Sequence, residues 1–150
     1  MSDFGPCPAP YSAPWVDLPR PYVELVAQCL IVRGVDVLDH WNDPLDPRDV
    51  SVIVRSGGPA APGRLRFVWD EESGWRFGPM DAEGWVALER TRYLPGGLLP
   101  DPDQVAAVVG RVLAGTETGS PHRPHYRSFR DYGDGFDARL AAYARAALPR

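Results

Sequence analysis

Two stretches near the middle of the chain alternate between apolar and polar side chains, and this alternation constrains the fold more than any other feature. The apolar positions are Val50, Val52 and Val54 in the first stretch and Leu65, Phe67 and Trp69 in the second. Successive side chains of a strand point to opposite faces, so each stretch is predicted to be a strand with one apolar face. The link between them, residues 56–63, is too short for a crossover connection, which predicts antiparallel pairing.

Weaker signals of the same kind predict strands over residues 35–41, 75–77 and 85–93. Three other segments show the spacing of amphipathic helices, and they cover residues 21–34, 102–115 and 136–148. The second helix has the clearest bounds, because Asp101 and Gln104 form a capping-box pattern and Gly115 suits a helix C-terminus.

The order of these elements predicts an α+β fold. It is a two-layer sandwich, in which two to three helices pack on one face of an antiparallel sheet of four to five strands. Residues 1–19 are expected to be a Pro-rich leader, extended or mobile, and residues 20–115 to form the α+β domain. Residues 116–150 are expected to be an irregular connector and a C-terminal helix packed on the same domain.

The charge and composition of the chain disfavour several classes of function. The net charge is −4, which gives no overall attraction to nucleic acid or to an anionic membrane. All 16 basic residues are arginine, so neither a Schiff-base lysine nor a P-loop lysine is present. No apolar run reaches the roughly 18 residues of a membrane helix, and the N-terminus lacks the pattern of a secretory signal. We therefore expect a cytoplasmic protein without membrane association.

Two segments resemble a family of small uncharacterised actinobacterial proteins, a domain of unknown function. They are FVWDEESGW at residues 67–75 and RYLPGGLLP at residues 92–100. The first resembles the family's WDEExGW hairpin, and the second resembles its LLPxP sequence before a Val/Ala-rich helix. The resemblance covers about residues 20–115. It implies no activity and no catalytic residue, because the family has no established function.

The acidic triplet Asp70, Glu71 and Glu72 occupies the expected turn between two strands. Paired carboxylates can act as general acid and base, but this chemistry needs them at a defined separation around a substrate. Adjacent turn residues rarely converge on a pocket, so we interpret these three as solvated residues that keep the turn out of the core.

Trp69, Trp75 and Trp85 form a second candidate group. Trp69 and Trp75 flank the expected turn and are predicted to pair across the hairpin, and Trp85 could join them from the next strand. Core packing is the favoured interpretation because Trp69 continues the apolar face of its strand. The alternative is an exposed platform for a peptide or base, or a pocket beside these rings that binds a small ligand.

Metal ligands are poorly represented. His122 and His125 form a lone pair, and neither His40 nor a Cys-x-x-Cys motif completes a zinc site. The aspartates of residues 36–49 lack the spacing of a calcium loop, which predicts a solvated acidic loop. We expect no metal, no cofactor and no catalytic residue.

Residues 122–130 interleave Arg123, Arg127 and Arg130 with histidine, tyrosine and phenylalanine and contain no acid. Such a segment could lie on the acidic 36–49 loop of its own domain, dock an acidic partner protein, or bind single-stranded nucleic acid. The net charge makes nucleic acid the least favoured of the three.

These observations favour a non-enzymatic protein-interaction or regulatory module, with a possible protein partner. One alternative is a small-ligand-binding domain or enzyme that uses a pocket near Trp69, Trp75 and Trp85. Another is weak binding of single-stranded nucleic acid through residues 122–130. The sequence carries no signal for the oligomeric state.

Overall fold

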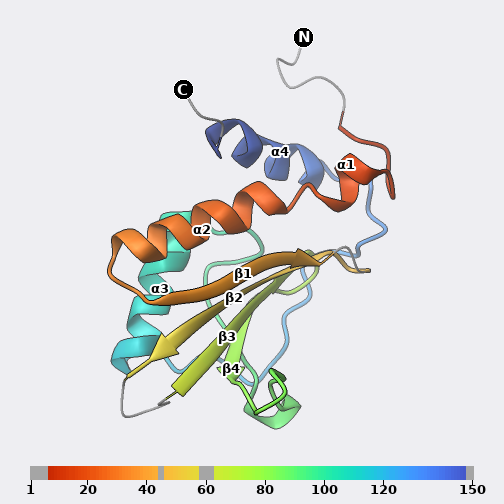
Figure 1. Cartoon of the computed structure of the whole chain (residues 1–150). Coiled ribbons are helices and arrows are strands. Elements are labelled where there is room, and N and C mark those ends of the chain that lie inside the picture. Colours follow the sequence, from red (N-terminus) through yellow and green to blue (C-terminus); the bar gives the residue numbers. More distant parts are fainter. Residues whose placement is uncertain (1–6, 44–45, 58–62, 148–150) are drawn as a thin grey trace.

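The computed structural model describes residues 7–43, 46–57 and 63–147, and within them the chain forms one open antiparallel sheet (Figure 1). The strands follow the chain order, so each pairs with its sequence neighbour. They are β1 (Val37–Asp43), β2 (Asp49–Ser56), β3 (Gly63–Asp70), β4 (Gly74–Pro79) and β5 (Arg92–Tyr93). The two stretches with the clearest alternation are the core of β2 and β3, which confirms the prediction of an antiparallel pair.

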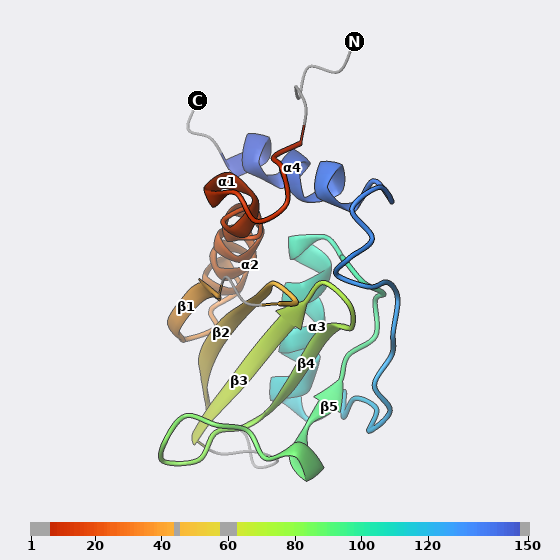
Figure 2. The same ribbon diagram turned by 90° about the vertical axis from the view of Figure 1, so that its right-hand side faces the viewer.

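Three longer helices accompany the sheet, and a short helix precedes them. They are α1 (Ala13–Val16), α2 (Arg20–Val32), α3 (Pro102–Ala114) and α4 (Phe136–Ala147). Figure 2 views the sheet with α3 behind it, and in both ribbon views α1 and α4 lie together at one end of the molecule. The predicted α+β sandwich is confirmed.

The face of the sheet that meets the helices is called the inner face here, and it contains the core. Its buried residues from the strands are Val50, Val52, Val54, Leu65, Phe67, Trp69 and Trp75. Tyr22 of α2 lies against both indoles, donates its hydroxyl hydrogen to Pro100 O at 2.6 Å, and accepts from Trp75 Nε1 at 3.1 Å. Fixed polar contacts of this kind let tyrosine and tryptophan be buried without unpaired polar atoms.

Helix α3 begins and ends where the sequence predicts. Asp101 N–H donates to Gln104 Oε1 at 2.9 Å, and Gly115 adopts the left-handed conformation after the last turn. Leu140 of α4 and Phe136 at its start reach the same core, with the Phe136 ring stacked on Trp69 at 5.9 Å between centroids.

Two predictions of secondary structure are wrong. Residues 85–93 do not form one strand: Val86 makes an isolated bridge to Met80, Leu88–Arg90 form a 3₁₀ turn, and only Arg92–Tyr93 join the sheet. This segment crosses closely over β4, where a Cβ on Gly78 would overlap the Val86 side chain. The leader is also not extended throughout, because residues 13–16 form α1 and bury Trp15.

Candidate functional site

The turn between β3 and β4 holds a buried ionic cluster rather than solvated acids. Asp70 is 2% exposed and Glu71 is fully buried, so the prediction that these two carboxylates are solvated is wrong. Glu71 accepts hydrogen bonds from the Arg48 backbone N–H at 2.6 Å and from Arg48 Nη2 at 2.8 Å. Arg127 Nη1 donates to the same carboxylate at 2.8 Å. One carboxylate therefore compensates two buried guanidiniums.

Two further carboxylates complete this cluster. Asp137 of α4 accepts from Arg48 Nη2 at 2.7 Å and from Trp15 Nε1 at 3.0 Å. Asp134 accepts from Arg127 Nε at 2.6 Å. The guanidinium of Arg48 also lies 3.9 Å from the Trp15 ring centroid, which excludes water from its face. Every charged member of the cluster is paired. The cluster therefore holds α1, the segment before α4 and the start of α4 on the β3–β4 hairpin.

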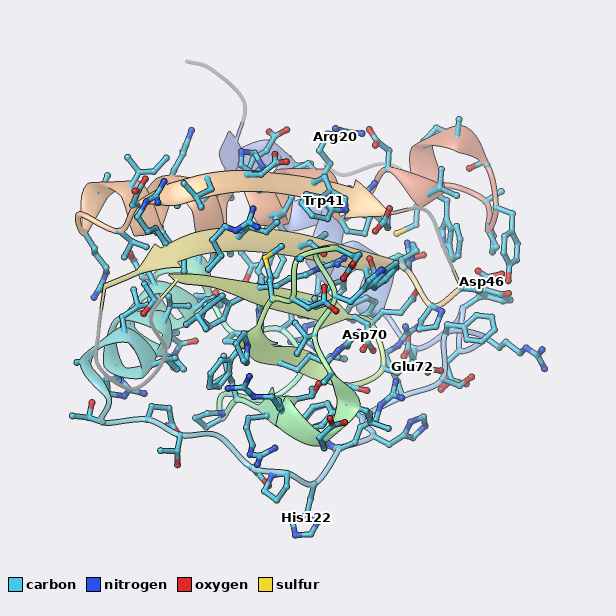
Figure 3. All side chains as sticks on the ribbon, turned by 60° about the horizontal axis from the view of Figure 1, so that its bottom comes forward. Arg20, Trp41, Asp46, Asp70, Glu72 and His122 are labelled. Carbon is cyan, nitrogen blue, oxygen red and sulfur yellow. The ribbon has the colours of Figure 1, made fainter. Side chains whose placement is uncertain are left out.

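The basic-aromatic segment, residues 122–130, contacts this hairpin turn. Tyr126 N–H donates to Glu72 O at 2.8 Å, and Phe129 N–H donates to Glu72 Oε2 at 3.0 Å. Figure 3 shows Asp70 and Glu72 at the turn, and His122 projecting from the body farther along the segment. The expected contact within the domain was with the acidic 36–49 loop, whereas the bonds described here join the segment to the hairpin turn.

The three predicted arginines therefore have different environments. Arg127 is buried in the ionic cluster, whereas Arg123 is exposed and donates from Nε to Ser73 Oγ at 2.7 Å. Arg130 is exposed, with its guanidinium 5.3 Å from the Phe129 ring centroid.

The three tryptophans do not form one group either. Trp69 and Trp75 pair across the hairpin in the inner core, as predicted. Trp85 lies on the other side of the sheet, called the outer face here, and is 67% exposed. Its failure to join the other two follows from the missing strand at residues 85–93.

The outer face brings together charged residues that the sequence analysis did not single out as a site. The register across β1, β2 and β3 places Asp43, Asp49 and Asp70 in one row. Alternate positions on β3 and β4 add Arg66 and Arg76 to the same face. A cavity of about 280 Å³ opens between this face and the 85–91 segment. It is lined by Asp43, Asp49, Arg66, Val68, Arg76, Trp85, Val86 and Thr91.

Most of the polar groups around this cavity have partners. Arg76 forms an ion pair with Asp70, whose other carboxylate oxygen accepts from the Glu72 and Ser73 backbone. Arg66 donates to Ser51 Oγ at 3.1 Å and to Gly84 O at 3.1 Å. These bonds fix the guanidinium and hold the 85–91 segment over the sheet.

Arg66 also lies close to two indole rings. Its guanidinium carbon is 5.1 Å from the Trp41 centroid and 5.9 Å from the Trp85 centroid. Trp41 Nε1 in turn donates to Asp43 Oδ2 at 3.0 Å. The rings and the guanidinium form one contiguous aromatic and charged wall.

Asp49 is the exception among these groups. Its Oδ1 atom is shielded from solvent and accepts no hydrogen bond from any residue that the structure describes. Burial and, to a smaller extent, the neighbouring Asp43 carboxylate raise the pKa of the Asp49 carboxyl to about 7, against the opposing influence of Arg76. An ionisable group of this kind in a cavity marks a candidate functional site.

Within the described residues, no three His, Cys, Asp or Glu side chains are grouped so as to hold a metal ion. The row of aspartates on the outer face therefore does not form a cation cage. The structure also contains no helix, in the part that it describes, with the length and apolar character needed to cross a bilayer.

The fold and the cavity together define a two-layer α+β domain whose sheet has a charged hollow on the face away from its helices. The chain belongs to DUF6292, a family of unknown function whose model matches residues 22–111. Comparison with curated proteins and with solved structures gives no match.

Proposed function

We propose that the chain is a non-enzymatic interaction module that binds a protein partner on the outer face of its sheet. The single observation that supports this proposal is the charged cavity bordered by Trp85, which is exposed over 67% of its surface. Leu88 in the same segment is 82% exposed. Protein-binding surfaces concentrate their energy in aromatic and arginine side chains beside a desolvated pocket, and this face offers that combination.

The cavity has room for a single side chain of a partner. Its volume of about 280 Å³ lies just below the range of roughly 300–1,000 Å³ that is usual for sites that enclose a drug-sized ligand. Binding of single-stranded nucleic acid through residues 122–130 is less well supported, because Arg127 is buried in an internal ionic cluster.

The proposal is tested by affinity capture with the full chain and matched surface variants. Trp85→Ala combined with Leu88→Ser removes the exposed indole at the cavity and the exposed Leu88 side chain of the same segment. Val32→Ser is the control, because Val32 is 86% exposed but lies on α2. We expect the wild type and the control to retain the same protein, and the double variant to retain at least tenfold less. Equal retention by all three proteins would refute the proposed surface.

The finer expectations from the sequence also belong to this proposal. We propose an actinobacterial origin and a cytoplasmic location, and that the WDEExGW hairpin and the LLPxP segment characterise the family. The all-arginine basic composition, typical of a GC-rich genome, supports the origin. Cell fractionation with an antibody to the chain tests the location.

A further inference from the structure

The charged groups on the cavity walls are not all paired with one another. Asp43 and Asp49 both line the cavity, and neither forms an ion pair with a described residue. Arg76 is committed to Asp70, which Arg123 also approaches at 3.8 Å. Arg66 donates to a hydroxyl and a carbonyl and makes no ion pair within the described chain. Both guanidiniums are thus bonded to other groups, and among the described residues neither forms an ion pair with Asp43 or Asp49.

We infer that this cavity receives the cationic end of a lysine or arginine side chain from the protein partner. The inference rests on the proposed function and adds the chemistry of the partner. A bound ammonium or guanidinium group would donate to the Asp43 and Asp49 carboxylates that line the cavity and would give them the ion-pair partner that no described residue provides.

The alternatives fit the walls less well. An anionic group would have to displace the bonds that Arg66 makes to Ser51 and Gly84, or separate Arg76 from Asp70, and it would face the Asp43 and Asp49 carboxylates. A neutral side chain would not relieve the repulsion between the Asp43 and Asp49 carboxylates.

The inference has a specific pH signature. The groups that face Asp49 are Asp43 from β1, Asp70 and Arg66 from β3, and Arg76 from β4. Since the pKa of Asp49 is about 7, its carboxyl is mostly ionised at pH 8 and mostly protonated at pH 6. A cation that pairs with the ionised form should therefore bind about tenfold more weakly at pH 6 than at pH 8.

The test uses the full chain labelled with ¹⁵N and the peptide acetyl-Gly-Lys-Gly-amide, with binding followed by NMR. We expect the peptide to shift the indole N–H signals of Trp41 and Trp85 and to lose about tenfold in affinity from pH 8 to pH 6. Asp49→Asn should weaken binding at pH 8 at least tenfold and remove the pH dependence. Asp36→Asn, at an exposed pair with Arg55, is the control and should bind as the wild type does.

Two neutral or anionic peptides separate the inference from the proposed function. If the acetyl-lysine or the Glu version of the peptide shifts the same indole signals as strongly, the inference of a cationic partner is overturned, while the outer face stays a binding surface. If none of the peptides shifts these signals, the inference is also overturned, and the capture experiment then decides the proposed function. The Asp49→Asn spectrum must keep the wild-type dispersion, which shows that lost binding does not reflect unfolding.

Discussion

Replacing Glu71 with glutamine should destabilise the protein by about 3 kcal/mol. The glutamine side chain keeps the shape of glutamate, but it removes the negative charge that the Arg48 and Arg127 guanidiniums share. Removing one partner of a buried ion pair costs about 3–5 kcal/mol, because the other charge stays buried without compensation. Asp137 still pairs with Arg48, and Asp134 still pairs with Arg127, which places the expected cost at the lower end of that range.

Urea denaturation at pH 7, followed by tryptophan fluorescence, measures this loss. A loss of this size corresponds to a fall in Tm of about 6–12 °C for a chain of 150 residues. Glu83→Gln is the matched control, since Glu83 is exposed, and its cost should stay below about 0.5 kcal/mol. If Glu71→Gln costs less than about 1 kcal/mol, the buried ionic cluster does not hold the structure together as argued, and the reasoning from its paired charges is wrong.

Three further substitutions test other parts of the structure by the same denaturation assay. The pKa of Asp49 is raised from 3.8 to about 7, so the wild type loses stability as the pH rises from about 4 to about 7. The free energy of unfolding of Asp49→Asn should equal that of the wild type near pH 4 and exceed it by about 2 kcal/mol at pH 8. This figure is roughly half of the energy that the full pKa shift represents, because Asp49 is partly exposed. A stability difference that does not change with pH would contradict this prediction. Gly74→Ala should cost more than about 2 kcal/mol, because φ is +74° and the new Cβ would lie 2.7 Å from Gly97 O. Trp15→Ala should lower the free energy of unfolding by about 3–4 kcal/mol, because the buried indole packs against Arg48. A loss below about 0.5 kcal/mol, as is usual for an exposed side chain, would contradict this prediction.

Local patterns were sufficient to predict most of the fold. Alternation identified β2 and β3, and the capping box and Gly115 gave the bounds of α3, because these signals depend on neighbours a few residues apart. The strand expected at residues 85–93 failed for a tertiary reason. The close approach of Val86 to Gly78 folds this segment over the sheet face, and only Arg92 and Tyr93 extend the ladder.

Less of the candidate site than of the fold could be predicted from the sequence. An acidic turn is normally solvated, and Glu71 differs only because Arg48 and Arg127 reach it from 23 and 56 residues away. Arg66 alternates with the apolar residues of β3, which is the pattern of a side chain on the outer face, and Asp49 is at the start of the same kind of pattern in β2. What the sequence lacked was the register of β1, which places Asp43 beside Asp49.

The ionic cluster has a practical consequence for anyone who shortens this protein. A fragment trimmed to the family-matched residues 22–111 would keep Arg48 and Glu71 but discard the side chains that complete their pairing. It would also strip the Phe136 ring from the buried indole of Trp69. Crystallisation or screening fragments should therefore retain both flanks of the matched region, from Trp15 through α4, so that these buried charges keep their counterions.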